Sequence, residues 1–285
     1  MAAHDRPPAV LSIAGSDSGG GAGIQADLKA FAACGVHGMT AITALTAQNT
    51  RGVTGVHTVP GAFILEQVLA VQSDIGVDAV KIGMLGTAET VNAVADALEL
   101  LPESTPVVLD PVMVAESGAV LLDESAREAL VKRLLPRATV ITPNVPEARV
   151  LARTGGVGGD PEHADLERLV RALHCLGPAH VVVTGGHREE ATDLFFDGGT
   201  VTEIEGERFA DGAAHGSGCT HSSALAAHLA LGFAPLEAAR MAKAVAARAV
   251  QDGLRGIGEG PGPVDVLGLT VRARHNGGRA TTALS

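Results

Sequence analysis

The sequence predicts a three-layer α/β/α fold, in which helices cover both faces of a mostly parallel sheet. Two observations lead to this prediction. Short apolar and β-branched runs alternate with longer segments whose apolar residues recur at helical spacing, and strands that alternate with helices in this way pair in parallel. No internal repeat and no long linker divides the 285 residues. We therefore expect one domain over residues 9–270, with flexible tails at 1–8 and 271–285.

The strands are expected where apolar runs end at a glycine, a proline or a polar residue. In chain order these runs are 10–14, 40–47, 79–84, 107–110, 139–142 and 180–184. Two further runs, 193–197 and 201–205, flank Gly198 and Gly199 and therefore predict a β-hairpin. Residues 15–23 follow the first strand and are so rich in glycine that we expect a loop there.

The helices are expected in the longer segments between these strands. In the first of them, 24–33, the residues Ile24, Leu28 and Phe31 share one face. The remaining helical segments are 62–75, 88–101, 125–135, 146–153, 165–175, 220–231 and 236–252. Since helices and strands alternate, ligands are expected beyond the carboxyl ends of the strands.

Composition narrows the class of protein. Hydrophobic residues make up 46% and charged residues 19% of the chain, which is typical of a globular protein. A net charge of −11 and the absence of Trp and Tyr argue against a nucleic-acid groove. The three cysteines, Cys34, Cys175 and Cys219, form no CxxC pair, so neither a disulfide framework nor a zinc knuckle is expected. With no signal-like or membrane-spanning stretch, we expect a cytoplasmic protein that binds no membrane.

The glycine-rich segment 15–23 is the first candidate for ligand binding. Glycine lets backbone amides approach a ligand closely, and the helix that follows favours an anion or polar group at its start. Residues 21–26 fit the dinucleotide pattern GxGxxA, but no acidic residue that could bind a ribose occurs between Asp27 and Glu66. No P-loop pattern occurs either. The alternative is a glycine-rich turn made for tight packing.

A second glycine turn, Gly216-Ser-Gly-Cys-Thr220, precedes an expected helix. Amides at such a helix start, around Gly216 and Gly218, can surround a phosphoryl anion. Cys219 would lie in the first helical turn, where the helix dipole lowers the pKa of a thiol, so that a thiolate could accept the proton of a substrate hydroxyl. The alternative is a helix cap followed by a buried, inert cysteine.

Oxygen ligands follow two further strands. Asn144 and Glu147 form an N-x-x-E pattern that predicts either a capping box or, with Asp110 at the end of another strand, a Mg²⁺ and phosphate site. Thr184 and Gly186 follow the strand at 180–184 and can approach a phosphate, or can form only a tight exit from the sheet. Lys243 is a candidate phosphate cation, although a lysine in such a helix is commonly a surface residue.

Together these segments resemble the bacterial hydroxymethylpyrimidine/phosphomethylpyrimidine kinases of the ribokinase-like superfamily. The matching stretches occur in the family's order, at residues 13–29, 42–50, 81–85, 109–113, 142–147, 185–187 and 216–220. The resemblance implies ATP and Mg²⁺ as cofactors and a homodimer. It also implies two successive phosphoryl transfers, to 4-amino-5-hydroxymethyl-2-methylpyrimidine and then to its monophosphate.

The resemblance also implies roles for single residues. Five residues would line the pyrimidine pocket: Gly15, Asp27, Gln48, Met84 and Val112. Cys219 would be the catalytic base, with Gly216 and Gly218 in the anion hole. ATP and phosphates would be bound by Asn144, Thr184, Gly186 and Lys243, and the metal by Asp110 and Glu147.

The chain departs from the commoner family pattern at three positions. Thr184 stands where many relatives have lysine, Ser217 replaces threonine, and His221 stands where an apolar residue is usual. Two alternatives stay open beside the pyrimidine kinase. One is a pyridoxal kinase of the same fold, and the other is a catalytically weak protein that senses pyrimidines or nucleotides.

Overall fold

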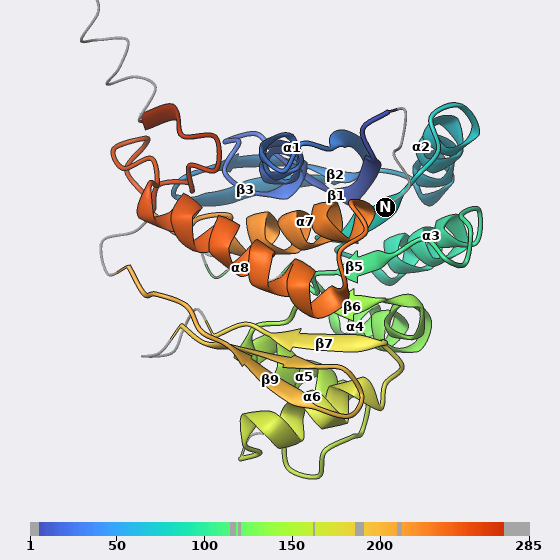
Figure 1. Cartoon of the computed structure of the whole chain (residues 1–285). Helices are drawn as coiled ribbons and strands as arrows, with labels where there is room; N and C mark the ends of the chain where they lie inside the picture. The colour runs from blue at the N-terminus through green and yellow to red at the C-terminus, as the bar shows by residue number, and fades with distance from the viewer. Residues whose placement is uncertain are drawn as a thin grey trace, which may run out of the picture.

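A single nine-stranded sheet organises the protein, as the computed structural model shows (Figure 1). The structure describes residues 6–114, 118, 121–161, 163–185, 191–209 and 213–270. The strands are β1 (Ala9–Asp17), β2 (His37–Asn49), β3 (Gly52–Thr58), β4 (Ala79–Ile82), β5 (Val107–Leu109), β6 (Val140–Ile141), β7 (His180–Val183), β8 (Asp193–Phe196) and β9 (Val201–Ile204). Their order in the sheet is β3-β2-β1-β4-β5-β6-β7-β8-β9. The inner pairs from β2 to β7 are parallel, and β3, β8 and β9 pair antiparallel at the two ends.

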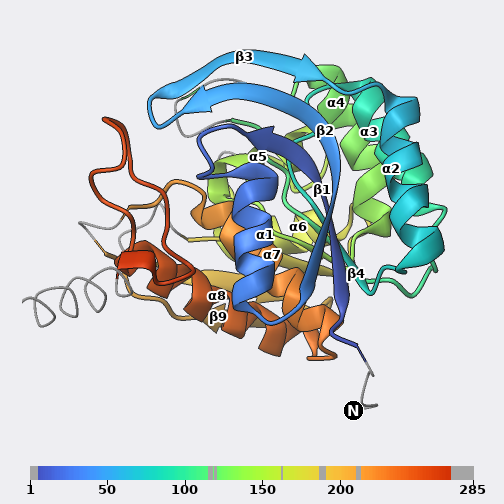
Figure 2. The same ribbon diagram turned by 90° about the horizontal axis from the view of Figure 1, so that it is seen from above.

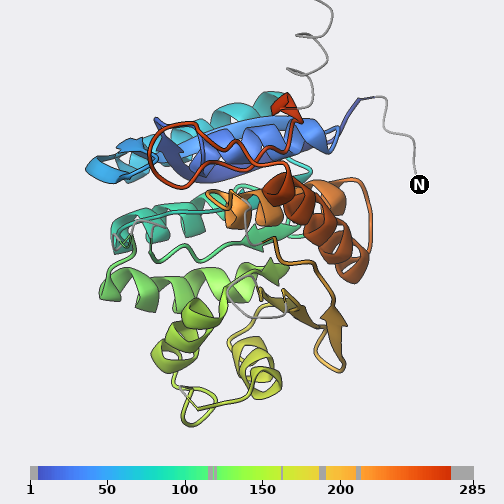
Figure 3. The same cartoon turned by 90° about the vertical axis from the view of Figure 1, so that its left-hand side faces the viewer.

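Helices cover both faces of this sheet, which confirms the three-layer prediction (Figures 1 and 3). One face carries α1 (Gly23–Ala33), α7 (Ser217–Ala230) and α8 (Pro235–Gln251). The other carries α2 (Gly61–Asp74), α3 (Ala88–Leu98), α4 (Glu124–Ala129), α5 (Val145–Thr154) and α6 (Leu166–His174). The alternation of side chains along a strand explains the two cores: Leu11 and Ile13 pack into one, and Val10 into the other.

Three details of the fold differ from the sequence prediction. β1 continues to Asp17, since Ser16 and Asp17 still pair with β2, so the first three residues of the predicted loop belong to the strand. β3 was not predicted, because all of its residues are exposed or half-buried and it has no apolar alternation. The helix expected at 125–135 is α4 followed by a π-helical segment (Leu130–Leu134) and a 3₁₀ turn (Leu135–Arg137).

Other predictions concern the chain ends and the loops. The tail expected at 271–285 lies outside the described residues, but Arg6 of the other expected tail pairs with Asp78 at 2.9 Å. All three cysteines are free thiols. Within the described part of the chain, no helix has the length and apolarity that crossing a membrane requires.

Seen from above, the long β2–β3 ribbon curves over α1 (Figure 2). The segment after α8 approaches the tip of this ribbon, where Arg51 forms an ion pair with Glu259.

Candidate active site

The predicted site segments meet at the carboxyl edge of the sheet. β1, β4, β5, β6 and β7 run parallel, so the residues that follow them lie along one edge. The N-terminus of α7 reaches the same edge, because Ser222 in its second turn bonds to Asp110 after β5. Fragments far apart in sequence therefore contribute to one site.

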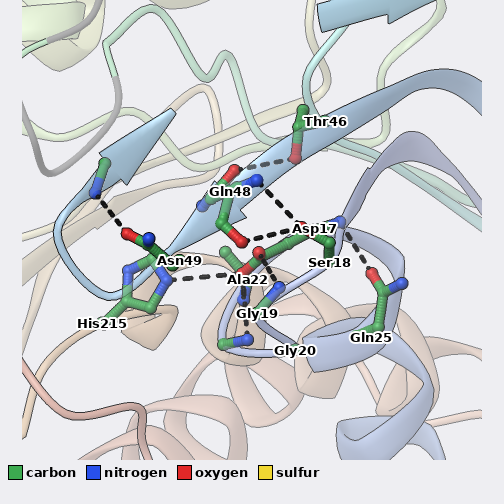
Figure 4. A network of polar contacts seen from close by, with 12 residues as sticks. Asp17, Ser18, Gly19, Gly20, Ala22, Gln25, Thr46, Gln48, Asn49 and His215 are labelled. Carbon is green, nitrogen blue, oxygen red and sulfur yellow. Dashed lines mark hydrogen bonds and ion pairs between the residues drawn. The ribbon is translucent and has the colours of Figure 1, made fainter. Parts of the chain in front are cut away.

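The glycine-rich loop after β1 is organised by Asp17 (Figure 4). Its buried carboxylate accepts hydrogen bonds from the amides of Gly19, Gly21 and Ala22 at 2.8–2.9 Å. His215 Nε2, from the turn before α7, lies 3.5 Å from Asp17 Oδ2. Burial alone would raise the pKa of Asp17, but His215 and the three amides outweigh it and lower this pKa. Asp17 thus carries a negative charge that links the loop to the second glycine turn.

Gln48 lies next to this loop, near the end of β2 (Figure 4). Ser18 donates to its carbonyl oxygen at 2.7 Å and accepts from its backbone amide at 2.8 Å. The side-chain oxygen of Gln48 accepts from Thr46 at 3.1 Å. No hydrogen bond among the described residues uses its side-chain nitrogen, so this donor is available to a ligand.

Gly216 is the N-cap of α7 and has a left-handed backbone, with φ of 81°. A Cβ at this position would lie 1.9 Å from the carbonyl oxygen of Gly21, so only glycine fits between the two turns. The amide of Ser217 bonds to Ala214, whereas those of Gly218 and Cys219 have no backbone acceptor within the described residues. Within the described residues, two backbone donors at this helix N-terminus are therefore available to an anion.

Cys219 lies in the first turn of α7 and is half-buried. Its sulfur accepts a hydrogen bond from the amide of Gly23. Burial raises the pKa of the thiol to about 12, and the charges of Asp27 and Asp110 act in the same direction against Lys81. The predicted low thiol pKa is therefore wrong: the surrounding carboxylates and burial outweigh the helix N-terminus, and the thiol is protonated at neutral pH.

Asp27 forms a buried ion pair with Lys81, at 2.8 Å between Oδ1 and Nζ. Ser223 donates to the same oxygen at 2.7 Å, and Ser12 to the other at 2.6 Å. Burial would lower the pKa of Lys81, but the charges of Asp27, Cys219 and Asp110 raise it above its usual range. This corrects the expectation that Asp27 lines the pyrimidine pocket, since its side chain has no exposed surface and both oxygens accept from protein donors.

The structure shows one of the two roles considered for Glu147, the capping box. It forms the predicted capping box of α5 with Asn144, in which each side chain accepts from the other's backbone amide at 2.9–3.0 Å. Burial and the nearby Asp110 raise the pKa of Glu147 to about 8, despite hydrogen bonds from the amides of Asn144 and Met113. Burial also raises the pKa of Asp110, against the effect of Lys81 and Ser222. Two carboxylates that oppose each other's ionisation favour a cation between them.

The apolar residues expected around the pyrimidine come together in part. A Cβ on Gly15 would lie 2.6 Å from the terminal methyl carbon of Met84, so the two positions are adjacent. Thr43 holds the carbonyl of Met84 at 2.8 Å. Val112 lies two residues after Asp110 on the loop after β5, where its amide bonds to the carbonyl of Asp110, and it is half-buried.

The phosphate-side residues also meet in space. Asn144 and Thr184 form a parallel bridge between the ends of β6 and β7. Gly186 lies outside the described residues. Lys243, on α8, donates to Asp193 Oδ1 at 2.7 Å and is mostly buried, so it is not the surface lysine that its helix suggested.

Several residues of the site were missed by the sequence analysis. Lys81 and Asp193 lie in short strands that the sequence identified only as strands. The sequence did contain a signal for these two residues, since each is a charged residue inside or at the start of an apolar strand. A charged side chain that is buried in a strand needs a partner of opposite charge. The Asp17–His215 and Asp27–Ser223 contacts join residues about 200 positions apart. No local sequence pattern predicts contacts over such a separation.

The sheet order, the helix N-terminus beyond it and the paired carboxylates define a kinase of the ribokinase-like fold. A Staphylococcus aureus pyridoxal kinase in complex with AMP-PCP and pyridoxal has a TM-score of 0.79 and 35% identity over 91% of this chain and 93% of its own. A Clostridium difficile phosphomethylpyrimidine kinase has a TM-score of 0.71 and 40% identity over 83% and 96%.

Sequence comparison identifies the family within this class. The model of the family described as phosphomethylpyrimidine kinase matches residues 17–265. A hydroxymethylpyrimidine/phosphomethylpyrimidine kinase from Rhizobium meliloti is 51% identical over 89% of this chain and 95% of its own length. The chain belongs to the phosphomethylpyrimidine kinase family, whose members are phosphotransferases, and the resemblance inferred from its motifs is confirmed.

Proposed function

We propose that this protein transfers phosphoryl groups from ATP first to the hydroxymethyl group of 4-amino-5-hydroxymethyl-2-methylpyrimidine and then to the monophosphate. The observation that carries the proposal is the joining of two glycine turns at one sheet edge. Gly216 packs against Gly21, so the loop next to Gln48 and the amides of α7 face one site. A pyrimidine at the first turn would hold its hydroxymethyl group near the anion site at the second.

The pyrimidine pocket is formed by Gly15, Gln48, Met84 and Val112. The side-chain nitrogen of Gln48 can donate to a ring nitrogen, while its oxygen is held by Thr46. Gly15 and Met84 are adjacent and suit one face of a flat ring. Asp27 acts indirectly, because it fixes Lys81 beneath this pocket.

The phosphates are bound by the α7 turn, Asn144, Thr184 and Lys243. The free amides of Gly218 and Cys219 are positioned for the transferring phosphoryl group, whose charge they stabilise. Gly186 is assigned to the same group by the family resemblance alone.

The donor set at Asp110 and Glu147 fits Mg²⁺. Within the described residues no group of three or more His, Cys, Asp or Glu side chains could hold a metal ion. Mg²⁺ commonly keeps several waters and uses one or two carboxylates together with nucleotide phosphates, which these two residues supply. When bound, the ion neutralises charge on the phosphate oxygens.

Cys219 accepts the hydroxyl proton in the first transfer. Because its thiol has a pKa of about 12, only a small fraction is ionised at neutral pH. That fraction is a stronger base than an ordinary thiolate. The second transfer does not need this step, because a phosphate acceptor is already ionised. Most of the catalysis then comes from positioning and charge neutralisation, as in other phosphoryl transfers.

A coupled assay with Mg²⁺ and ATP tests the proposal directly. The same preparation is offered hydroxymethylpyrimidine, its monophosphate and pyridoxal. Turnover of both pyrimidines with little turnover of pyridoxal is the expected result. Turnover of the monophosphate alone would remove Cys219 from the mechanism.

Pyridoxal phosphorylation is the second candidate, favoured by one observation. A structure similar over 91% of this chain is that of a pyridoxal kinase. Turnover of pyridoxal alone in the same assay would establish it. Tight pyrimidine binding without any transfer would instead indicate the sensor.

We also propose that the protein is a cytoplasmic homodimer, as the family resemblance implies. Sedimentation equilibrium at micromolar concentration measures its mass directly. A single species near the 28.7 kDa of one chain would contradict the dimer.

A further inference from the structure

Asp193 is the centre of a buried charged cluster beside the phosphate turn. Its side chain is 1% exposed and lies at the start of β8. Oδ1 accepts from Lys243 Nζ at 2.7 Å and from the amide of Gly185 at 2.8 Å. The carboxylate therefore holds both the cation proposed for phosphate binding and the turn after β7.

The other side of this carboxylate faces His221. Asp193 Oδ2 is buried and has no hydrogen-bond partner among the described residues, and His221 Nε2 lies 3.8 Å from it. His221, in the second turn of α7, is 5% exposed, and neither of its ring nitrogens has a hydrogen-bond partner in the described part of the chain. A buried imidazole and a buried carboxylate oxygen thus lie close together without a bond, which is unusual because buried polar atoms are nearly always paired.

The protonation of His221 is coupled to the position of Lys243. Among the described residues, the charged groups that act on the imidazole are Asp193 from β8 and Lys243 from α8. Burial lowers the pKa of His221, Asp193 raises it and Lys243 lowers it. The Lys81–Asp27 pair and Asp110 bond instead to the next residues of α7, Ser223 and Ser222. Removing the ammonium from Asp193 would therefore favour the imidazolium.

We propose that Asp193 is the resting partner of Lys243, and that His221 is a positioning residue which binds a proton and pairs with Asp193 when Lys243 moves to a phosphate. The inference rests on the proposed phosphate-binding role of Lys243. Without His221, the movement of Lys243 would leave the buried Asp193 carboxylate with no positive partner, which is costly. With His221 present, its Nε2 takes up one proton from solvent when the nucleotide binds and returns this proton when the nucleotide leaves. The net charge of the cluster therefore stays the same.

The electrostatic half of the proposal is tested without any ligand. The histidine ring signals of ¹⁵N-labelled protein are titrated by NMR in the wild type and in Lys243→Met. The pKa of His221 is expected to rise by about one unit or more in the variant, corresponding to roughly a tenfold coupling. His228 on the same helix bonds to Ala224 and is the internal control, because it faces neither Asp193 nor Lys243. An unchanged His221 would overturn the coupling.

The functional half is tested by the proton uptake that accompanies ADP binding. Calorimetry with Mg²⁺ and ADP at pH 7.5, in buffers of different ionisation enthalpy, gives the number of protons bound. The wild type should take up several tenths of a proton more than His221→Leu. Protonation changes of ADP itself are the same for both proteins, so they drop out when the two values are subtracted. Equal uptake in the two proteins would overturn the proposal.

Kinetics separates positioning from a merely structural role. The ratio of the wild-type KM for ATP to that of His221→Leu should rise at least about threefold from pH 6.5 to pH 8.5. The corresponding ratio of kcat values should not change over this range. His221→Gln, which can bond to Asp193 but carries no charge, should follow the leucine variant. If ADP does not bind at all, the proposed function fails, while the ligand-free titration still decides the pairing of His221 with Asp193.

Discussion

Replacing Lys81 with methionine would leave Asp27 as a buried carboxylate without its cation. Both side chains have no exposed surface and the pair is 2.8 Å apart, so solvent cannot replace the lost charge. Of the described residues, only Ser12 and Ser223 would still bond to the carboxylate, through their hydroxyls. Removing one partner of a buried pair costs about 3–5 kcal/mol. For a chain of this size, such a loss lowers Tm by on the order of 10 °C.

The double variant Lys81→Met/Asp27→Asn separates the charge from the packing. An amide at position 27 is neutral and can still accept from Ser12 and Ser223, so the double variant should recover about 2 kcal/mol or more of the loss. Urea denaturation gives the free energies of unfolding. Arg6→Met is the matched control, because the Arg6–Asp78 ion pair is almost equally short, at 2.9 Å, but is partly exposed. This variant should cost less than about 1 kcal/mol.

Two outcomes would refute this reasoning. Lys81→Met could unfold with a free energy within about 1 kcal/mol of the wild type, or the double variant could be no more stable than the single one. Either result would mean that the charge of Asp27 is not held by Lys81. Since Lys81 also lowers the pKa values of Asp110 and Cys219, the single variant should lose the first phosphoryl transfer even where it is fully folded.

Three further predictions follow from the pKa values and the backbone of the site. The pKa of Glu147 is about 8 in the folded protein against an ordinary 4.5, so between these pH values the folded protein keeps a proton that the unfolded chain releases. In metal-free buffer the free energy of unfolding should therefore fall by about 3 kcal/mol from pH 5 to pH 8. Urea denaturation of Glu147→Gln should lack this fall. With a thiol pKa of about 12 at Cys219, kcat/KM of the first transfer should rise about tenfold per pH unit between pH 6.5 and 8.5. A plateau below pH 8, or equal single-turnover losses of both transfers in Cys219→Ala, would contradict this role. Gly216 has a φ of 81°, and a Cβ at this position would lie 1.9 Å from a carbonyl oxygen. Gly216→Ala should therefore abolish both transfers and lower Tm. An active variant would disprove the role of this turn in binding the phosphoryl group.

The layers of the fold were predictable because they depend on local periodicity. Apolar runs such as Val107–Leu109 are buried on both faces and read clearly as parallel strands. β3 was not predictable, since it pairs at the edge of the sheet with every residue at least partly accessible. Its position is set by pairing with β2, which is a long-range property.

The sequence by itself determined which residue types reach the edge of the sheet, because glycine turns and oxygen ligands follow strands there. It could indicate that Gly216 begins a helix and that Asn144 and Glu147 fit a capping box. Only the tertiary structure decided which charges face one another. Asp27 is taken by Lys81 rather than by a ligand, and the carboxylates around Cys219 raise a thiol pKa that the helix alone would lower. The physical reason is that a pKa or an ion pair depends on burial and on neighbours within a few ångströms, and these come from segments far apart in the chain.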